Sequence, residues 1–306
     1  MHWIKSLVID EVIYLKFNKL SEKNEGLINS LDLRHCSMKI LYTVMVVVMF
    51  ILTLVCLIPI LWVVLSSIKP VEEMYRVPPT IFPENIDFTV WKSAWMKINM
   101  GKYIANSGII IIGAWFCDIA INGICGYVLS RLKPKGSGVL LNFILWSLMV
   151  PGISMIPVYE MIISLRGMNH YWPLWLMCGA NPFNVMLFRS FFNGIPMAYL
   201  EAARIDGLSD FKIFIRIIIP LSVPIIMVVS IFSVTTQWSS FMWPYLILSD
   251  NKVPMSVKLF QINSLTTIMD NERMAIALFA IIPPVIVYAI FSKYIMGGVS
   301  MTGIKG

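Results

Sequence analysis

The sequence predicts an all-α polytopic membrane protein that crosses the bilayer about six times. Of its 306 residues, 58% are hydrophobic and only 13% are charged, whereas soluble domains carry about 25% charged residues. Six apolar runs are each near or above the roughly 18 residues that a helix needs to cross the hydrocarbon. These runs are residues 40–66, 104–130, 139–160, 172–192, 217–248 and 275–292. Because lipid offers no partner to backbone amides and carbonyls, each run is expected to be helical.

The runs define one transmembrane domain, residues 40–296, between an N-terminal tail, residues 1–39, and a C-terminal tail, residues 297–306. The N-terminal tail lacks the compact apolar core and small-residue cleavage site of a signal peptide. We therefore expect it to remain on the mature protein, and we assign it no function.

The distribution of basic residues predicts the orientation of the chain. Lys and Arg concentrate in the short cytoplasmic loops of membrane proteins. The basic residues of both tails fall on the same side as the cluster Arg131, Lys133 and Lys135, so both termini are predicted to be cytoplasmic. This distribution also accounts for the net charge of +7, and no nucleic-acid partner is predicted.

An acidic residue lies inside the second run. Asp118 and Asn122 are four residues apart, so a helix places them on one face, and the following Gly123 and Gly126 allow another helix to approach closely. An ionisable group at that depth costs at least about 2.5 kcal/mol unless it faces protein or water. Two interpretations stay open: neighbouring hydroxyl groups or a second subunit satisfy Asp118, or it lines a polar path for a solute.

The third and fourth runs contain backbone breaks. Pro151 and Pro157 release carbonyl groups in the third run, which lipid cannot satisfy. That run is therefore expected to face the interior of the helix bundle, and its Trp146 is a candidate for the solute path. In the fourth run, Asn181-Pro182 predicts a break.

A charged segment, residues 194–216, separates the fourth and fifth runs. A helix that begins near Pro196 would place apolar residues on one rough stripe, broken at Gly207. The stripe comprises Leu200, Ala203, Leu208, Phe211 and Ile215. The paired alanines, Ala202 and Ala203, would leave a smooth surface, while Gly207 suits a left-handed helix end and Ser209 suits the N-cap of a second helix. Composition alone leaves two roles open, a connector in the headgroup region or a docking element for another protein.

The fifth run contains a polar cluster, Thr235-Thr236-Gln237-Trp238-Ser239-Ser240. Hydroxyl and amide groups beside an aromatic face suit sugars, which present many hydroxyls and an apolar ring face. The same groups also form hydrogen bonds between membrane helices. Candidates for a solute path are therefore Gln237, Trp238, Ser239 and Ser240, with bonding between helices as the alternative.

The sequence contains no recognisable nucleotide-binding, metal-binding or catalytic motif. No GxxxxGK[ST] loop is present to bind nucleotide phosphates, so any driving energy must come from another chain. The five cysteines form no CxxC pair and predict neither a disulfide nor a metal site. An intramembrane enzyme would need Asp118, Glu160 and His170 to converge, and no HExxH or GxSxG signature accompanies them. We therefore predict no catalytic residue, no enzyme activity and no cofactor in this chain.

The charged segment resembles the motif of a known family. Glu201-Ala202-Ala203-Arg204-Ile205-Asp206-Gly207, with Ile219-Pro220 a dozen residues later, is similar to the EAA loop of binding-protein-dependent ABC importer permeases. Further stretches look like the carbohydrate branch of that family, the maltose-permease type. These stretches are Asn106-Ser107, Tyr127 to Leu132, Val150-Pro151-Gly152, Ile156-Pro157, Arg189 to Phe192, Ile195-Pro196 and Gly303-Ile304-Lys305-Gly306.

The resemblance implies a type I ABC importer permease fold in a bacterial cell membrane, and a function in the import of a sugar or oligosaccharide. The implied partners are membrane lipid, a second homologous permease, two cytoplasmic ABC ATPase subunits that carry ATP and Mg, and an extracytoplasmic solute-binding protein. The charged segment is then implied to couple the permease to the ATPase. The implied coupling residues are Glu201, Ala202, Ala203, Arg204, Asp206, Gly207 and Phe211, and Gly303 and Lys305 are implied to reach the ATPase dimer.

Two departures from the family pattern fall where a solute would pass. The family often has Trp-Asn-Asp where this chain has Trp238-Ser239-Ser240, and it usually has a small or apolar residue near Asp118. Specificity therefore does not follow from the resemblance. An ABC permease for a polyamine, a peptide or phosphate stays an alternative.

Overall fold

The computed structural model describes residues 36–149, 155–265 and 267–302. Within these ranges the chain is helical and contains no β-strand, which confirms the predicted all-α class. The chain divides into two compact units, Met1–Trp62 and Val63–Gly306, and each is described by itself. Most of the predicted N-terminal tail, residues 1–39, lies outside the described residues.

The first unit is described from α2 (Cys36–Ser66), whose last residues belong to the second unit. Large apolar side chains are exposed on every face of this helix between Ile40 and Leu61. A helix that is apolar all round is a membrane span or a buried core helix. With 28 residues from Lys39 to Ser66, α2 is long enough to cross a bilayer.

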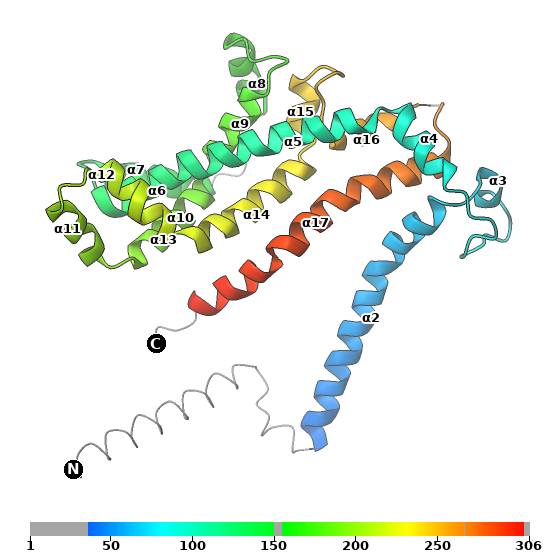
Figure 1. The fold of residues 1–306 in the computed structure, drawn as a ribbon, viewed down its shortest axis with the longest axis horizontal. Coiled ribbons are helices and arrows are strands. Elements are labelled where there is room, and N and C mark those ends of the chain that lie inside the picture. Colours follow the sequence, from blue (N-terminus) through cyan, green and yellow to red (C-terminus); the bar gives the residue numbers. More distant parts are fainter. Residues whose placement is uncertain (1–35, 150–154, 266, 303–306) are drawn as a thin grey trace. The chain divides into compact units, whose positions relative to one another are not determined.

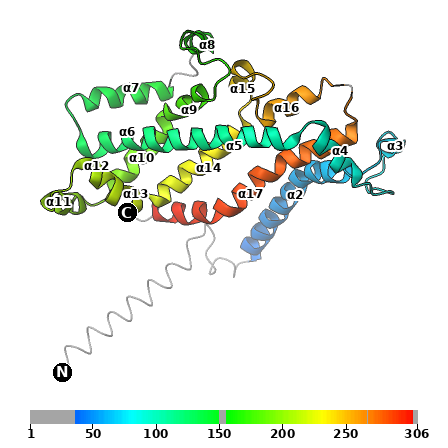
Figure 2. The ribbon, with the colours of Figure 1, turned by 45° about the horizontal axis from the view of Figure 1, so that its top comes forward.

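The second unit is a set of helices arranged along one long helix. Its elements are α3 (Val71–Met74), α4 (Thr89–Lys97), α5 (Met100–Cys117), η2 (Asp118–Asn122), α6 (Gly123–Tyr127), η3 (Val128–Leu132), α7 (Ser137–Met149), α8 (Met155–Ser164), α9 (Trp172–Gly179), α10 (Pro182–Gly194), α11 (Met197–Ile205), α12 (Asp210–Ile213), η4 (Phe214–Ile218), α13 (Ile219–Leu221), α14 (Val223–Ser239), α15 (Met242–Ile247), α16 (Met255–Ile262) and α17 (Asp270–Thr302). Figures 1 and 2 show α11 and α12 at one end of the continuous α5–η3 helix, and α4 and α16 at the other end.

Three helices in the described part of the chain are long and apolar enough to span a membrane. They are Lys39–Ser66, Met100–Leu132 and Asp270–Ile290. A fourth span is possible if Asp210–Leu221 and Val223–Ser239 count as one, and these two helices are bent by 79° at Ser222. The predicted runs 139–160 and 172–192 each correspond to two shorter helices, and the second pair breaks at Asn181, next to the proline that predicted the break. The count of six spans stays a prediction.

The second span contains two π-helical turns, η2 and η3, which the sequence pattern did not predict. A π turn accommodates one extra residue and often marks a functional site. The first of them carries both Asp118 and Asn122, so the side chains that reach α10 project from an irregular stretch of helix.

Close approach of α6 to α10 depends on Gly126. A Cβ atom added there would lie 2.7 Å from Cβ of Phe188 and 3.0 Å from the backbone N of Arg189. We expect Gly126→Ala to lower the free energy of unfolding by about 1–3 kcal/mol, because it overpacks a helix interface. At Gly123 the nearest atom is 3.9 Å away, so Gly123→Ala is the matched control and should be tolerated. Thermal unfolding of the detergent-purified protein measures both, and equal midpoints for the two variants would contradict the prediction.

Two buried apolar clusters stabilise the second unit. The first lies around Ala94, Met100, Val257 and Ile276, where α4, α5, α16 and α17 meet. The second is called here the loop cluster, and it lies at the opposite end of α5–η3. It comprises Tyr127, Phe188, Phe192, Ile195, Leu200, Ala203, Ile213, Phe214, Ile218 and Val229. The loop cluster therefore joins α6, α10, α14 and the charged segment in one packed core.

Candidate functional site

The charged segment folds into two short helices joined by a sharp turn, as the sequence predicted. Helix α11 begins directly after Pro196. At its end, the N–H of Gly207 donates to the carbonyl of Arg204 at 3.0 Å, and the N–H of Leu208 donates to the carbonyl of Ala203 at 3.0 Å. Gly207 has φ +77°, the left-handed conformation expected for a helix end. Ser209 occupies the N-cap position of α12, although its side chain makes no capping hydrogen bond.

The predicted apolar stripe across this segment is only partly correct. Leu200 and Ala203 are buried in the loop cluster and the half-buried Leu208 packs against it, but Phe211 is 66% exposed and Ile215 is also exposed. The turn at Gly207 changes the register of the second helix, so that Ile213 and Phe214 are buried instead. The two alanines also differ in exposure, since Ala203 is buried while Ala202 is exposed.

The outward face of the segment mixes charged and apolar groups. It carries the side chains of Glu201, Ala202, Arg204, Ile205, Asp206 and Phe211, all exposed, together with the exposed backbone of Gly207. We call this set the coupling face, after the role that the resemblance implies for it. Ile205 is 86% exposed, and the sequence analysis did not single it out. Ile205 and Phe211 are the large apolar side chains of this face, and they are exposed among charged residues.

An ion pair crosses the turn between the two short helices. Nη2 of Arg204 lies 3.0 Å from Oδ1 of Asp210, and Nε of Arg204 donates to the same oxygen at 3.3 Å. Both side chains are exposed, so the pair contributes at most about 1 kcal/mol to stability. It is one of the contacts that cross the turn between α11 and α12.

Arg131 attaches the charged segment to the long helix. Its guanidinium donates hydrogen bonds to the carbonyl oxygens of Phe192 and Ile195, at the end of α10, and to Sδ of Met197 at 2.9 Å. A cation at the last carbonyls of a helix is stabilising. The sequence analysis treated Arg131 only as a marker of orientation. The one signal for its role was its place in the Tyr127–Leu132 stretch.

Tyr127 supports the same junction from the neighbouring turn of helix. Its ring lies 4.9 Å from the ring of Phe214 and 6.3 Å from that of Phe192, measured between centroids. The two contacts join η4 and α10 to α6. The coupling face therefore rests on a packed aromatic base.

A buried polar cluster surrounds Asp118 at the centre of the second unit. Nδ2 of Asn122 donates to Oδ1 of Asp118 at 2.6 Å, and Nδ2 of Asn184 donates to both carboxyl oxygens at 2.8 and 3.0 Å. All three side chains are at most 2% exposed. No Lys, Arg or His in the described ranges forms an ion pair with Asp118. Amide groups of Asn122 and Asn184 and the hydroxyl of Ser233, all from its own chain, therefore stabilise the acid. The other predicted role, lining a path for a solute, stays a prediction.

The Asp118 cluster forms one wall of a polar cavity. The cavity has a volume of about 170 Å³ and lies between η2, α10 and α14. It is lined by Asp118, Cys178, Asn181, Phe183, Asn184, Phe232, Ser233, Thr236 and Gln237. Two predicted solute-path residues, Asp118 and Gln237, thus meet in one site although they are far apart in the sequence.

The other solute-path candidates lie outside this cavity. Trp146 is exposed on α7, where it contacts only the ring of Phe143 among the aromatic side chains described. Trp238 and Ser239 end α14, and the carbonyl of Ser240 accepts a hydrogen bond from Oγ of Ser256 at 2.7 Å. Asn122 supports Asp118 from behind and does not line the cavity.

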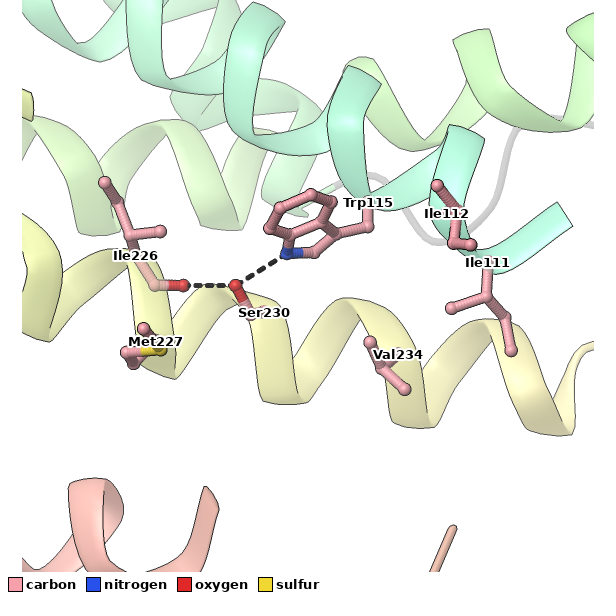
Figure 3. Close-up of a pocket in the computed structure, with 7 residues that line it drawn as sticks. All are labelled: Ile111, Ile112, Trp115, Ile226, Met227, Ser230 and Val234. Atoms are coloured by element: carbon pink, nitrogen blue, oxygen red, sulfur yellow. Dashed lines mark hydrogen bonds between the residues drawn. The ribbon is translucent and has the colours of Figure 1, made fainter. Parts of the chain in front are cut away.

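An apolar groove lies on a different face of the same helix, α14, where it meets α5 (Figure 3). Its volume is about 210 Å³, and its lining residues are Ile111, Ile112, Trp115, Ile226, Met227, Ser230 and Val234. Nε1 of Trp115 donates to Oγ of Ser230 at 2.7 Å, and Ser230 donates to the carbonyl of Ile226 at 2.6 Å. These polar groups of the groove are therefore paired with each other.

The residues that an intramembrane enzyme would need are not brought together. Glu160 and His170 are exposed, and neither lines the cavity beside Asp118. Nδ1 of His170 lies 2.9 Å from the carbonyl oxygen of Met168. Within the described ranges, no three His, Cys, Asp or Glu side chains are grouped so that they could hold a metal ion.

The folded segment, its buried base and the helical architecture are those of a transporter permease. The family described as binding-protein-dependent transport system inner membrane component matches residues 122–300, more than half of the chain. The chain belongs to this family, whose members are permease components of ABC transporters. The matched region includes the coupling face, α10, α14 and α17.

Individual relatives agree with this assignment. The chain is 28% identical over 269 residues to the polygalacturonan/rhamnogalacturonan transport system permease protein YtcP of Bacillus subtilis, covering 83% of this chain and 94% of YtcP. It is 28% identical over 290 residues to the arabinooligosaccharides transport system permease protein AraQ of the same species, covering 90% and 100%. A crystal structure of a bacterial ABC transporter that imports the acidic polysaccharide alginate is similar over 85% of this chain and 98% of the matched chain, with 25% identity and a TM-score of 0.77.

Proposed function

We propose that this chain is the membrane-spanning subunit of an ATP-driven importer for a sugar or oligosaccharide. The observation that carries the proposal is the coupling face, an outward Glu-Ala-Ala helix whose inward side is packed into the core of a family permease. The saccharide part rests on the solutes named for YtcP, AraQ and the alginate importer. The solute arrives on an extracytoplasmic binding protein.

The proposed assembly contains a second homologous permease and two ABC ATPase subunits, which carry ATP and Mg and dock beneath the coupling face. In this assembly the chain crosses the cell membrane six times with both termini in the cytoplasm. The C-terminal Gly303 and Lys305, which lie outside the described residues, reach the ATPase dimer. This chain contributes no catalytic residue and no cofactor.

The packing supports a mechanical path from the coupling face to the solute. Leu200 and Ala203 on α11 pack in the loop cluster with Phe188, one turn from Asn184 on α10. Asn184 in turn holds the carboxylate of Asp118. When ATP binding closes the ATPase dimer, the displaced α11 shifts α10 against α6 as a packed body. The walls of the polar cavity move with it, and the transporter alternates between its two openings.

Cysteine crosslinking tests the docking of the ATPase. In a background with the five native cysteines replaced by alanine, Ile205→Cys should form a disulfide or short-linker crosslink with an ATPase subunit of the assembled transporter. Val77→Cys is the matched control, because Val77 is an equally exposed apolar side chain outside the charged segment. A crosslink at both positions, or at neither, in fully assembled and active transporter would contradict the proposal.

A further inference from the structure

Large apolar side chains are exposed on the loop that joins the spans Lys39–Ser66 and Met100–Leu132. Five of them, each between 60% and 90% exposed, are Val77, Ile81, Phe82, Ile86 and Phe88. We call this set the exposed patch. Figures 1 and 2 show α3 and α4, the two helices of this loop, at the end of α5 opposite α11 and α12. A water-facing surface usually carries such side chains singly and scattered, so something other than water is expected to cover this set.

A buried polar network fixes the shape of the loop. Nζ of the buried Lys69 donates to the backbone carbonyl of Thr80 and, at 3.2 Å, to its hydroxyl. The buried carboxylate of Glu73 accepts from the hydroxyl of Thr80 at 2.8 Å and from the N–H of Glu84 at 3.0 Å. Thr80 and Glu84 are therefore both held in place, and the apolar residues between them are exposed on a defined backbone.

The loop is bonded to the end of a membrane span. The N–H of Asp87 donates to the carbonyl of Ile68 at 2.9 Å. Ile68 comes just after Ser66, the last residue of the span Lys39–Ser66. Both sequence neighbours of Asp87 belong to the exposed patch. Because a span ends where the hydrocarbon ends, this part of the patch lies at the membrane surface.

Aromatic contacts connect the patch to a second span, Asp270–Ile290. The ring of Phe88 lies 5.5 Å from that of Trp91, and the ring of Trp91 lies 5.7 Å from that of Phe279, measured between centroids. Phe279 lies within this span, and Nδ2 of Asn271, in its first turn, donates to the carbonyl of Lys69 at 3.0 Å. One indole ring therefore separates the exposed patch from an apolar helix that is long enough to cross the bilayer.

The composition of the loop suits the boundary between headgroups and acyl chains. Pro78, Pro79 and Pro83 lie among the patch residues and have no N–H that needs a partner. Unpaired backbone donors cost free energy where water is scarce, so these prolines lower the cost of placing the loop there. The charge of Arg76 is paired by Glu84 at 2.6 Å.

We propose that the exposed patch is buried in the adjacent lipid leaflet, at the boundary between headgroups and acyl chains. A binding protein that docks and leaves would expose the patch to water in every cycle, and interfaces with such partners are on the whole no more apolar than the rest of a protein surface. Lipid is present throughout. In the proposed orientation this is the outer leaflet, and the inference holds for any transported solute.

Quenching by a labelled lipid tests the contact. The complete transporter is placed in phosphatidylcholine nanodiscs, with or without phosphatidylcholine that carries a nitroxide near the glycerol end of one acyl chain. In the cysteine-free background, Phe82→Cys carries an environment-sensitive fluorophore. Glu72→Cys is the matched control, because Glu72 is an exposed charged residue of the same loop. We expect nitroxide quenching at Phe82→Cys to be at least about threefold that at the control, and iodide in solution to quench the two in the opposite order.

Other coverings of the patch give different results. Protection of the Phe82→Cys fluorophore from both nitroxide and iodide would assign the patch to the second permease. Iodide quenching that stops only when the solute-binding protein is added would assign it to that protein, and iodide quenching under all conditions would leave it in water. Each of these results, or equal nitroxide quenching at Phe82→Cys and Glu72→Cys, would overturn the proposal.

A second substitution connects the contact to the apolar character of the patch. In the labelled Phe82→Cys protein, Ile86→Asp should lower nitroxide quenching at least about twofold, because a charge is costly in the apolar part of the bilayer. Asn85→Asp adds the same charge at the adjacent exposed position and removes no apolar side chain. It should leave the quenching unchanged. Equal quenching in the two variants would contradict a contact that depends on apolar burial.

Discussion

Replacing Gly207 with proline is expected to abolish ATP-driven solute uptake while the chain still inserts in the membrane. Gly207 has φ +77°, and its N–H donates to the carbonyl of Arg204 at 3.0 Å. Proline has no N–H and requires φ near −65°, so it fits neither feature. The turn would open, and the two short helices that carry Glu201 and Phe211 would lose their relative orientation. Uptake of labelled solute by cells that express the whole transporter measures the loss.

A milder pair of variants separates the coupling role from backbone strain. Gly207 and Gly136 both have positive φ, and an added Cβ would meet no atom within 4 Å at either position. Alanine at each site therefore costs a similar amount, roughly 1–2 kcal/mol. We expect Gly207→Ala to reduce uptake severalfold and Gly136→Ala to leave it near the wild-type rate at equal abundance. Equal uptake by the two variants, or normal uptake by Gly207→Pro, would contradict the assignment of the coupling face.

Much of the architecture was predictable because the thickness of the bilayer sets the length of every membrane-spanning helix. The runs 40–66, 104–130 and 275–292 are each matched by a long apolar helix in the structure, Lys39–Ser66, Met100–Leu132 and Asp270–Ile290, with ends shifted by at most five residues. The break at Asn181 was predictable for a local reason, since Pro182 cannot continue a preceding helix and Asn181 caps the next one through Phe183 and Asn184. Both features depend on composition and on neighbours in sequence.

Features that depend on contacts between distant residues were not predictable in the same way. The π turn at Asp118 carries a side chain that is bonded to Asn184, 66 residues later, and no local pattern predicts such a pairing. The exposure of Phe211 has a local cause, the change of register at Gly207, which a single stripe drawn across both helices does not take into account.

The residues of the candidate site fall into the same two groups, those that local sequence indicates and those that only the packing of the helices identifies. The sequence indicated Asp118 from the cost of a charge in the membrane and Gln237 from a dense polar cluster, and the structure places both on one cavity. It gave no reason to choose Gln237 over Trp238 or Ser239, because only the orientation of α14 decides which side chains face Asp118. Ser233 and Asn184 were missed for that reason, since single polar residues are common in membrane helices.

Replacing Arg131 with leucine is expected to lower uptake at least about tenfold through loss of coupling. Its guanidinium donates hydrogen bonds to the carbonyl oxygens of Phe192 and Ile195. These residues lie at the end of α10, directly before the helix that carries the coupling face. Leucine fills some of the space but leaves these carbonyls without a donor, at a cost of about 1–3 kcal/mol. The junction between α10 and α11 would loosen, so α11 would move without carrying α10. Arg131→Lys retains the charge but lacks the planar fork, and should restore only part of the uptake.

The ratio of solute moved to ATP hydrolysed separates this positioning role from a general loss of stability. If Arg131 only stabilises the fold, its variants lower the amount of transporter and leave that ratio unchanged. If it transmits movement from α11 to α10, ATP hydrolysis continues while less solute enters for each ATP. Arg76→Leu is the control, because Arg76 forms an exposed ion pair with Glu84 at 2.6 Å, and such pairs contribute little. An unchanged ratio in Arg131→Leu would assign the residue to stability alone, and the path from the coupling face to the cavity would then have to run through Leu200 and the aromatic contacts of Tyr127.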